Sequence, residues 1–192
     1  MKNILTLLTV LLLSQSLISQ MSIDLEKSKI KWTGKKITNA SHWGSLSFSE
    51  ANLDFDGGDL IGGKFIVDMN SISVDDIQGR GKQRLEGHLR NEDFFDVENH
   101  KEAILLFNER VPLNNGVYEV TGTLTIKGIS NPVKFTLIPS GNNYSSNLTF
   151  DRTKFEITYR SGNFFENLLD DNHIHPTFPP IHYLYYHHRN LQ

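Results

Sequence analysis

The chain has 192 residues, of which 38% are hydrophobic, and a formal net charge of −3. This length suits one domain with a core large enough to be stable alone, and the small, dispersed charge gives no electrostatic footprint for nucleic acid. Because the sequence has no cysteine, disulfides, a thiol nucleophile and a thiolate metal site are excluded.

The first twenty residues have the build of a secretory signal. Lys2 precedes an apolar run from Ile4 to Leu13, and small polar residues follow. A membrane anchor would need about 20 apolar residues, and this run is much shorter. We expect cleavage near Ser16 or Ser19 and a mature protein that is periplasmic or secreted, with no stable membrane insertion.

From residue 22 onward the dominant pattern is alternation of apolar and polar residues, which is typical of half-buried antiparallel strands. Short strands are predicted around residues 30–32, 45–49 and 52–56. The sequence DGGD at 56–59 predicts a hairpin turn in which glycine supplies positive φ. It leads into a strand that carries Phe65, Val67 and Met69 on one face.

Residues 80–93 break the alternation. Leu85 and Leu89 have the i, i+4 spacing of a helix face, so we predict a short helix here, followed by an aromatic turn at Phe94 and Phe95. His88 lies inside this helix. It is either a helix-surface or capping residue or a ligand contact.

Strands are predicted again at 103–107, 117–128, 132–138 and 148–160, and a second helix around 164–169. About eight one-sided strands with little helix favour an all-β sandwich or a closed up-and-down barrel. A barrel of about eight strands is wide enough for one elongated small ligand. Periodicity alone does not distinguish apolar faces that fill a solid core from faces that line a cavity.

No catalytic motif stands out. The chain has no G-x-S-x-G elbow and no P-loop. Asp75 and Asp76 would point apart in an extended segment, which favours a solvated loop over a catalytic dyad. Trp43, next to His42, is interpreted as a core or rim aromatic. We therefore predict a protein that is not an enzyme and that holds neither a metal nor a cofactor.

Three stretches in combination resemble the YceI-like family of bacterial polyisoprenoid-binding proteins: RLEGHLRNEDFFDVENHKEAILLF, YEVTGTLTIKGISNPVKF and DRTKFEI. The resemblance covers about Ser22 to Leu169. It implies an eight-stranded antiparallel, lipocalin-like barrel with a short helix over it. It also implies an apolar tunnel that holds a long isoprenoid chain, such as a quinone tail or a polyprenyl lipid, and it carries over no catalytic residue and no metal.

By position, the helix and aromatic turn of the family fall at residues 84–97, near the tunnel or its lid. Together with the inward strand faces, this gives a set of predicted ligand-binding residues. They are Trp32, Phe65, Val67, Met69, His88, Leu89, Phe94, Phe95, Tyr118, Val120, Leu124, Ile126, Phe135, Leu137, Phe155 and Ile157.

The expected function is binding or carriage of a long isoprenoid or quinone-like lipid outside the cytoplasm. Two alternatives stay open. One is a scaffold-type stress or partner-binding protein with a solid barrel. The other is an enzyme that acts on a small apolar substrate in the same cavity.

The tail from Asn172 onward departs from the family pattern, so we divide the chain into a signal (1–20), a barrel domain (21–171) and an atypical tail (172–192). The tail holds five of the eight histidines and half of the six prolines. Histidine is a common metal ligand, but the prolines and the irregular histidine spacing disfavour a preformed metal site.

The family barrel closes with a final strand after residues like 161–171. Pro176, Pro179 and Pro180 remove ladder donors, so we expect this strand to be missing or replaced. A shifted reading frame and a true variant both explain such a tail. An exposed edge would also allow a second copy of the chain to pair with it as a homodimer.

Overall fold

A computed structural model describes residues 18–35, 41–157 and 181–185. Its strands are β1 (Ile18–Ser22), β2 (Ile30–Lys35), β3 (Ser41–Asp56), β4 (Asp59–Val74), β5 (Glu102–Pro112), β6 (Tyr118–Ile126), β7 (Ile129–Ser140), β8 (Asn143–Asn147) and β9 (Ile181–Tyr185). Its helices are α1 (Gly79–Arg90) and the 3₁₀ turns η1 (Asn114–Gly116) and η2 (Arg152–Phe155).

The strands form one antiparallel sheet in the order β1-β3-β4-β5-β6-β7-β8-β9, with β2 also paired to β3. β1 pairs with the end of β3 and β2 with its beginning, so these two strands share one edge of β3. The nine strands therefore occupy eight positions around the sheet. This confirms the predicted all-β, lipocalin-like architecture.

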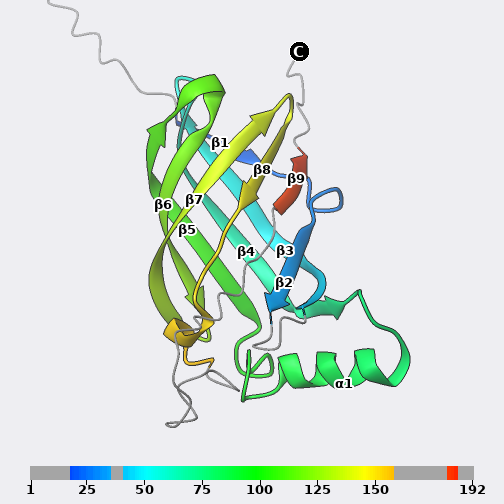
Figure 1. Cartoon of the computed structure of the whole chain (residues 1–192). Helices are drawn as coiled ribbons and strands as arrows, with labels where there is room; N and C mark the ends of the chain where they lie inside the picture. Colours follow the sequence, from blue (N-terminus) through cyan, green and yellow to red (C-terminus); the bar gives the residue numbers. More distant parts are fainter. Residues whose placement is uncertain (1–17, 36–40, 158–180, 186–192) are drawn as a thin grey trace, which may run out of the picture.

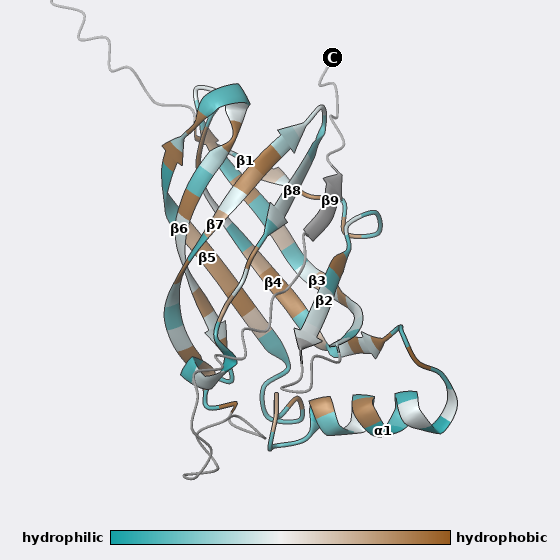
Figure 2. Cartoon of the chain, in the orientation of Figure 1, coloured by the Kyte–Doolittle hydropathy of each residue, from teal (hydrophilic) through white to brown (hydrophobic). Residues whose placement is uncertain are grey.

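The sheet curls around one apolar face into a barrel shape, and its two ends meet where β9 contacts β2 (Figure 1). Helix α1 contacts β4 and lies below the barrel, extending to one side of it, in the view of Figure 1. Apolar and polar residues alternate along the strands (Figure 2). As a result, the buried apolar side chains form one continuous cluster.

Helix α1 confirms the prediction made for residues 80–93. Leu89 is buried and Leu85 packs against the apolar cluster, so the i, i+4 pair marks the inner face of the helix. Glu86 Oε1 accepts a hydrogen bond of 2.9 Å from the backbone N–H of Val74. The helix is thereby tied to the end of β4.

The two short strands predicted at 45–49 and 52–56 are one strand, β3, of 16 residues. The pairing of β3 with β4 shifts register between Phe48 and Glu50. An extra residue at such a bulge changes the phase of alternation, so Phe48, Ala51 and Leu53 are all buried although they do not share one simple period. The break in alternation was a bulge and not the end of a strand.

The strand predicted at 148–160 is wrong over the residues described, because Arg152–Phe155 form the 3₁₀ turn η2. Asp151 precedes this turn, and its Oδ1 accepts hydrogen bonds from the backbone N–H of Thr153 at 2.9 Å and from Thr153 Oγ1 at 2.7 Å. This capping competes with strand formation. Glu156 then ends the turn in a left-handed conformation, with φ of 57°.

Three strands were missed by the sequence reasoning. β1 begins inside the predicted signal, so the boundary drawn at residue 20 falls within a strand. β8, with the sequence NYSSN, lacks apolar alternation. β9 lies in the tail, where it pairs with β8 directly after Pro180. The prolines therefore precede the strand and do not interrupt it, and the final strand is replaced and not missing.

The helix predicted around 164–169, most of the predicted signal and the remainder of the tail lie outside the described residues.

Candidate functional site

The inner wall of the barrel is built by side chains that face one another across neighbouring strands. Phe65 on β4 pairs with Leu105 on β5, which pairs with Leu124 on β6. Val120 on β6 pairs with Phe135 on β7. Because directly opposed residues share a face of the sheet, these strands present one continuous apolar wall to the interior.

Aromatic rings run along this wall from β3 to β7. The ring centroids of Phe48 and Phe65 are 5.9 Å apart, those of Phe65 and Phe107 are 6.3 Å apart, and those of Phe107 and Phe135 are 5.8 Å apart. Such offset and edge contacts add to the free energy of apolar burial. In this state the wall side chains pack against one another, so an inserted apolar chain would have to separate them.

Trp32 on β2 is fixed at the edge of the same interior. Its indole Nε1 donates a hydrogen bond of 3.0 Å to the backbone carbonyl of Ser73. Gly44 lies directly opposite on β3. A Cβ atom at Gly44 would overlap the Ser73 carbonyl oxygen and lie 2.8 Å from Trp32 Cε2. The glycine therefore makes room for the indole.

The base of the barrel is closed by the aromatic turn that follows α1. The backbone N–H groups of Phe95 and Val97 bond the carbonyls of Leu89 and Arg90 at 3.2 and 3.0 Å, which folds the turn back onto the helix end. The Phe94 ring makes edge contacts with Phe95 at 4.9 Å and with His88 at 5.7 Å between centroids. This unit, residues 88–97, is named the basal cap.

A buried cation adjoins the basal cap. Arg152 of η2 is 8% exposed. Its Nη1 donates a hydrogen bond of 2.8 Å to the carbonyl of Ile157, and its Cζ lies 5.4 Å from the centroid of the Phe94 ring. Burial lowers the pKa of Arg152 by disfavouring the charged form, an effect that the charge of Asp151 opposes. Sequence reasoning missed this residue, although it lies within the DRTKFEI stretch.

All of the predicted ligand-binding residues belong to this interior or to its cap. Most are fully buried in the single apolar cluster, whereas Val67, Phe94 and Tyr118 are partly buried against it. His88 is half-buried and contacts Phe94. The structure therefore brings these residues together, and their contact with a ligand stays a prediction.

Two polar residues that the sequence reasoning missed also face the interior. Arg110 on β5 pairs with the fully buried Val120, and Ser146 on β8 pairs with the buried Leu137. Strict alternation from Phe107 would place Arg110 outside, but the register of β5 shifts between Phe107 and Glu109. Ser146 was missed because β8 itself was not predicted.

A pocket of about 470 Å³ lies in the barrel wall beyond the last paired residues of β4 and β5, Gly63 and Phe107. Residues that line it include Ile61, Asn108, Glu109, Arg110, Glu119 and Thr121. Glu109 pairs with Thr121, and both lie on the outer face. Arg110 also lines this pocket, but its position on β5, opposite Val120, is on the inner face of the sheet.

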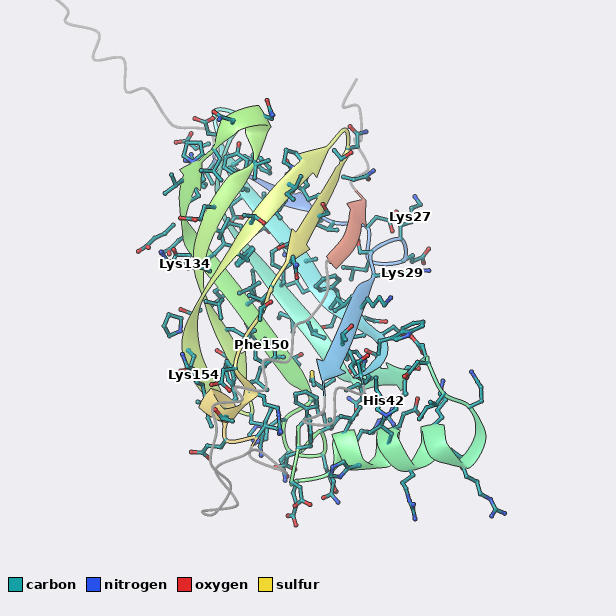
Figure 3. All side chains as sticks on the ribbon, in the orientation of Figure 1. Lys27, Lys29, His42, Lys134, Phe150 and Lys154 are labelled. Atoms are coloured by element: carbon teal, nitrogen blue, oxygen red, sulfur yellow. The ribbon has the colours of Figure 1, made fainter. Side chains whose placement is uncertain are left out.

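The acidic pair Asp75 and Asp76 does not form a dyad. Asp75 Oδ1 accepts a hydrogen bond of 2.7 Å from Ser73 Oγ, whereas Asp76 Oδ2 lies 2.8 Å from His42 Nδ1. The side chain of Asp76 is only 16% exposed, so the expectation of a solvated loop is not met there. His42 lies near α1 (Figure 3), and its bond to Asp76 connects the start of β3 to the segment before the helix.

Within residues 18–35, 41–157 and 181–185 no group of three or more histidine and acidic side chains is arranged to hold a metal ion. In the same part of the chain no helix has the length and hydropathy needed to cross a bilayer.

Fold and interior together define a class: a single-domain antiparallel barrel with an apolar interior, capped at one end by a helix and an aromatic turn. The family model for the YceI-like domain matches residues 21–175, and the chain belongs to this family.

The chain is also similar to individual proteins. A UPF0312 protein of Pectobacterium atrosepticum is 30% identical over 92 residues, which is 48% of this chain and 45% of that protein. The aligned region therefore spans about half the length of this curated relative. The crystal structure of Burkholderia cenocepacia BcnA superimposes with a TM-score of 0.60 at 24% identity, covering 82% of this chain and 94% of that one. A Campylobacter jejuni YCEI protein aligns with a TM-score of 0.48 at 19% identity, over 66% of this chain and 79% of that one.

Proposed function

We propose that the protein binds a long isoprenoid lipid in the barrel interior. The observation that carries this proposal is the continuous apolar wall, which extends from Trp32 on β2 through Phe65 and Phe135 to the basal cap. Membership of the YceI-like family supports it. Binding proteins hold apolar ligands in interiors of this kind, with few polar groups to fix their orientation.

Burial of the chain can supply the affinity. Each buried CH₂ group contributes about 0.8 kcal/mol, so a chain of several isoprene units gains more than about 10 kcal/mol before the costs of ordering and of separating the wall side chains are subtracted. Recognition of the head group then adds orientation more than affinity. Binding should depend strongly on the length of the chain.

We propose further that binding takes place outside the cytoplasm, in the periplasm or after secretion. Support comes from the N-terminal twenty residues, whose cation, short apolar run and small polar residues are typical of a secretory signal. Fractionation of cells that express the full chain tests this directly. We expect the protein in the envelope fraction or the medium, and retention in the cytoplasm would contradict the proposal.

A series of benzoquinones with one to four isoprene units tests lipid binding. We expect the dissociation constant to fall by about tenfold or more for each added unit, because each unit buries several CH₂ groups. Affinity that does not change with chain length would contradict binding in the apolar interior. Each quinone should also be recovered chemically unchanged, whereas a converted product would favour the enzyme alternative.

A further inference from the structure

Two polar groups in the barrel interior have no hydrogen-bond partner among the described residues. They are Ser146 Oγ and Arg110 Nε, and both atoms are buried. Ser146 as a whole is only 2% exposed. Burying a hydroxyl or guanidinium N–H without a partner costs free energy, and native proteins rarely leave such groups unmatched without a reason.

The strand registers bring these groups into one half of the interior. Ser146 pairs with Leu137, and Leu137 pairs with Tyr118, so the three residues lie in a row across β8, β7 and β6. Neighbouring strands are about 4.8 Å apart. The Tyr118 ring centroid lies 5.9 Å from Arg110 Cζ, which places the guanidinium beside the end of this row.

This half is the one farther from the basal cap. β5 ends and β6 begins at the upper end of the barrel in Figure 1, opposite α1. Phe150, which packs against Phe155 at 5.3 Å between centroids, lies towards the lower end (Figure 3). Arg110 and Ser146 thus lie in the half of the interior opposite the basal cap.

Arg110 also lines the pocket of about 470 Å³, whose other lining residues are exposed or only partly buried, so a polar group can reach Arg110 from solvent. Among the described residues no carboxylate lies within ion-pair distance of its guanidinium. Glu109 and Glu119 line the same pocket. Their charge is expected to make the site more favourable for a neutral oxygen than for a phosphate.

We propose that Arg110 and Ser146 bind the polar end of the lipid by donating hydrogen bonds to its oxygen acceptors, while the apolar chain extends towards the basal cap. This inference rests on the proposed function and adds the orientation of the ligand and the chemistry of its head group. A quinone carbonyl and a phosphate oxygen share the required chemistry, and the carbonyl is favoured.

Competition measured by native mass spectrometry tests the proposal. The full chain is mixed with three compounds that share the skeleton of one isoprenoid chain: a geranylgeranyl benzoquinone, geranylgeranyl phosphate and the hydrocarbon phytane, which has no head group. Arg110→Met removes the donors but keeps an extended apolar side chain, and Ser146→Ala removes only the hydroxyl. Arg80→Met, at an exposed position of α1, is the matched control.

In the unsubstituted protein we expect the quinone complex to exceed the phytane complex by about tenfold or more, as a hydrogen bond to a charged donor would give. Arg110→Met should bring this ratio close to one while phytane binding is retained, which also shows that the variant is folded. Ser146→Ala should lower the ratio by a smaller factor, and Arg80→Met should leave it unchanged. A phosphate complex that is lost in Arg110→Met more strongly than the quinone complex would still support the acceptor site, with a different head group.

An unchanged ratio in both Arg110→Met and Ser146→Ala would overturn the inference while lipid binding itself stands. Equal binding of all three compounds by the unsubstituted protein would overturn it as well. No binding of any of the three would overturn both the inference and the proposed function.

Discussion

Among the described glycines, Gly44 leaves the least room for a Cβ atom. It lies opposite Trp32, whose indole is bonded to the Ser73 carbonyl, and a Cβ atom would overlap that carbonyl. We expect Gly44→Ala to lower the free energy of unfolding by about 1–3 kcal/mol, because the extra methyl group must displace backbone or indole atoms. Urea denaturation followed by tryptophan fluorescence measures the change.

Gly87 is the matched control for this substitution. It lies on α1 with nothing within 4 Å of an added Cβ atom. Gly87→Ala should raise the free energy of unfolding by about 0.5–1 kcal/mol, because alanine loses less conformational freedom in a helix than glycine does. Equal effects of the two substitutions would show that the contact between Gly44 and Trp32 does not constrain the barrel edge.

At the scale of elements, the side chain of Asp151 caps the 3₁₀ turn η2. Asp151→Ala removes the acceptor for both Thr153 donors, and we expect a loss of about 1 kcal/mol in the free energy of unfolding. Asp151→Asn keeps a capping oxygen but removes the charge beside Arg152, so it should lose less. A larger loss in Asp151→Asn than in Asp151→Ala would contradict capping as the main role.

The type of the elements could largely be predicted from the sequence, whereas their boundaries could not. Alternation gave the apolar faces of β4, β6 and β7, and the spacing of Leu85 and Leu89 gave α1. The errors arose where a local effect competes with periodicity. They include the bulge in β3, the Asp151 cap and the polar strand β8.

Most of the apolar lining of the candidate site could also be predicted, because it belongs to regular strand faces, to the helix face or to the aromatic turn, whereas Phe155 and Ile157 are buried although η2 stands where a strand was predicted. Its polar members could not. Arg110 faces inward only because the register of β5 shifts after Phe107. Arg152 is buried only because η2 replaces a strand.

At the scale of the whole molecule, the tail supplies a strand of the sheet. β9 pairs with β8 and contacts β2, so removal of residues 172–192 would leave β8 as an exposed edge. We expect this truncation to lower the urea midpoint of unfolding and to cause association that grows with concentration, because an unpaired strand is a template for another chain. Size-exclusion chromatography with light scattering measures the association.

Removal of residues 186–192 alone keeps β9 and is the control for this experiment. This shorter truncation should change neither the urea midpoint of unfolding nor the oligomeric state of the protein. If the longer truncation behaves in the same way, the strand in the tail is not needed to complete the barrel. A homodimer of the full chain stays a prediction that the same measurement tests.

If the barrel binds an isoprenoid lipid, that lipid should accompany the protein from a bacterial envelope, and its identification is the most direct test. The full chain is purified without detergent exchange, its intact mass is measured under native and denaturing conditions, and its organic extract is analysed by mass spectrometry. We predict extra mass under native conditions that is lost on denaturation and a matching isoprenoid in the extract. Repeated isolation of a ligand-free protein, or of a protein that carries only fatty acids, would contradict the account.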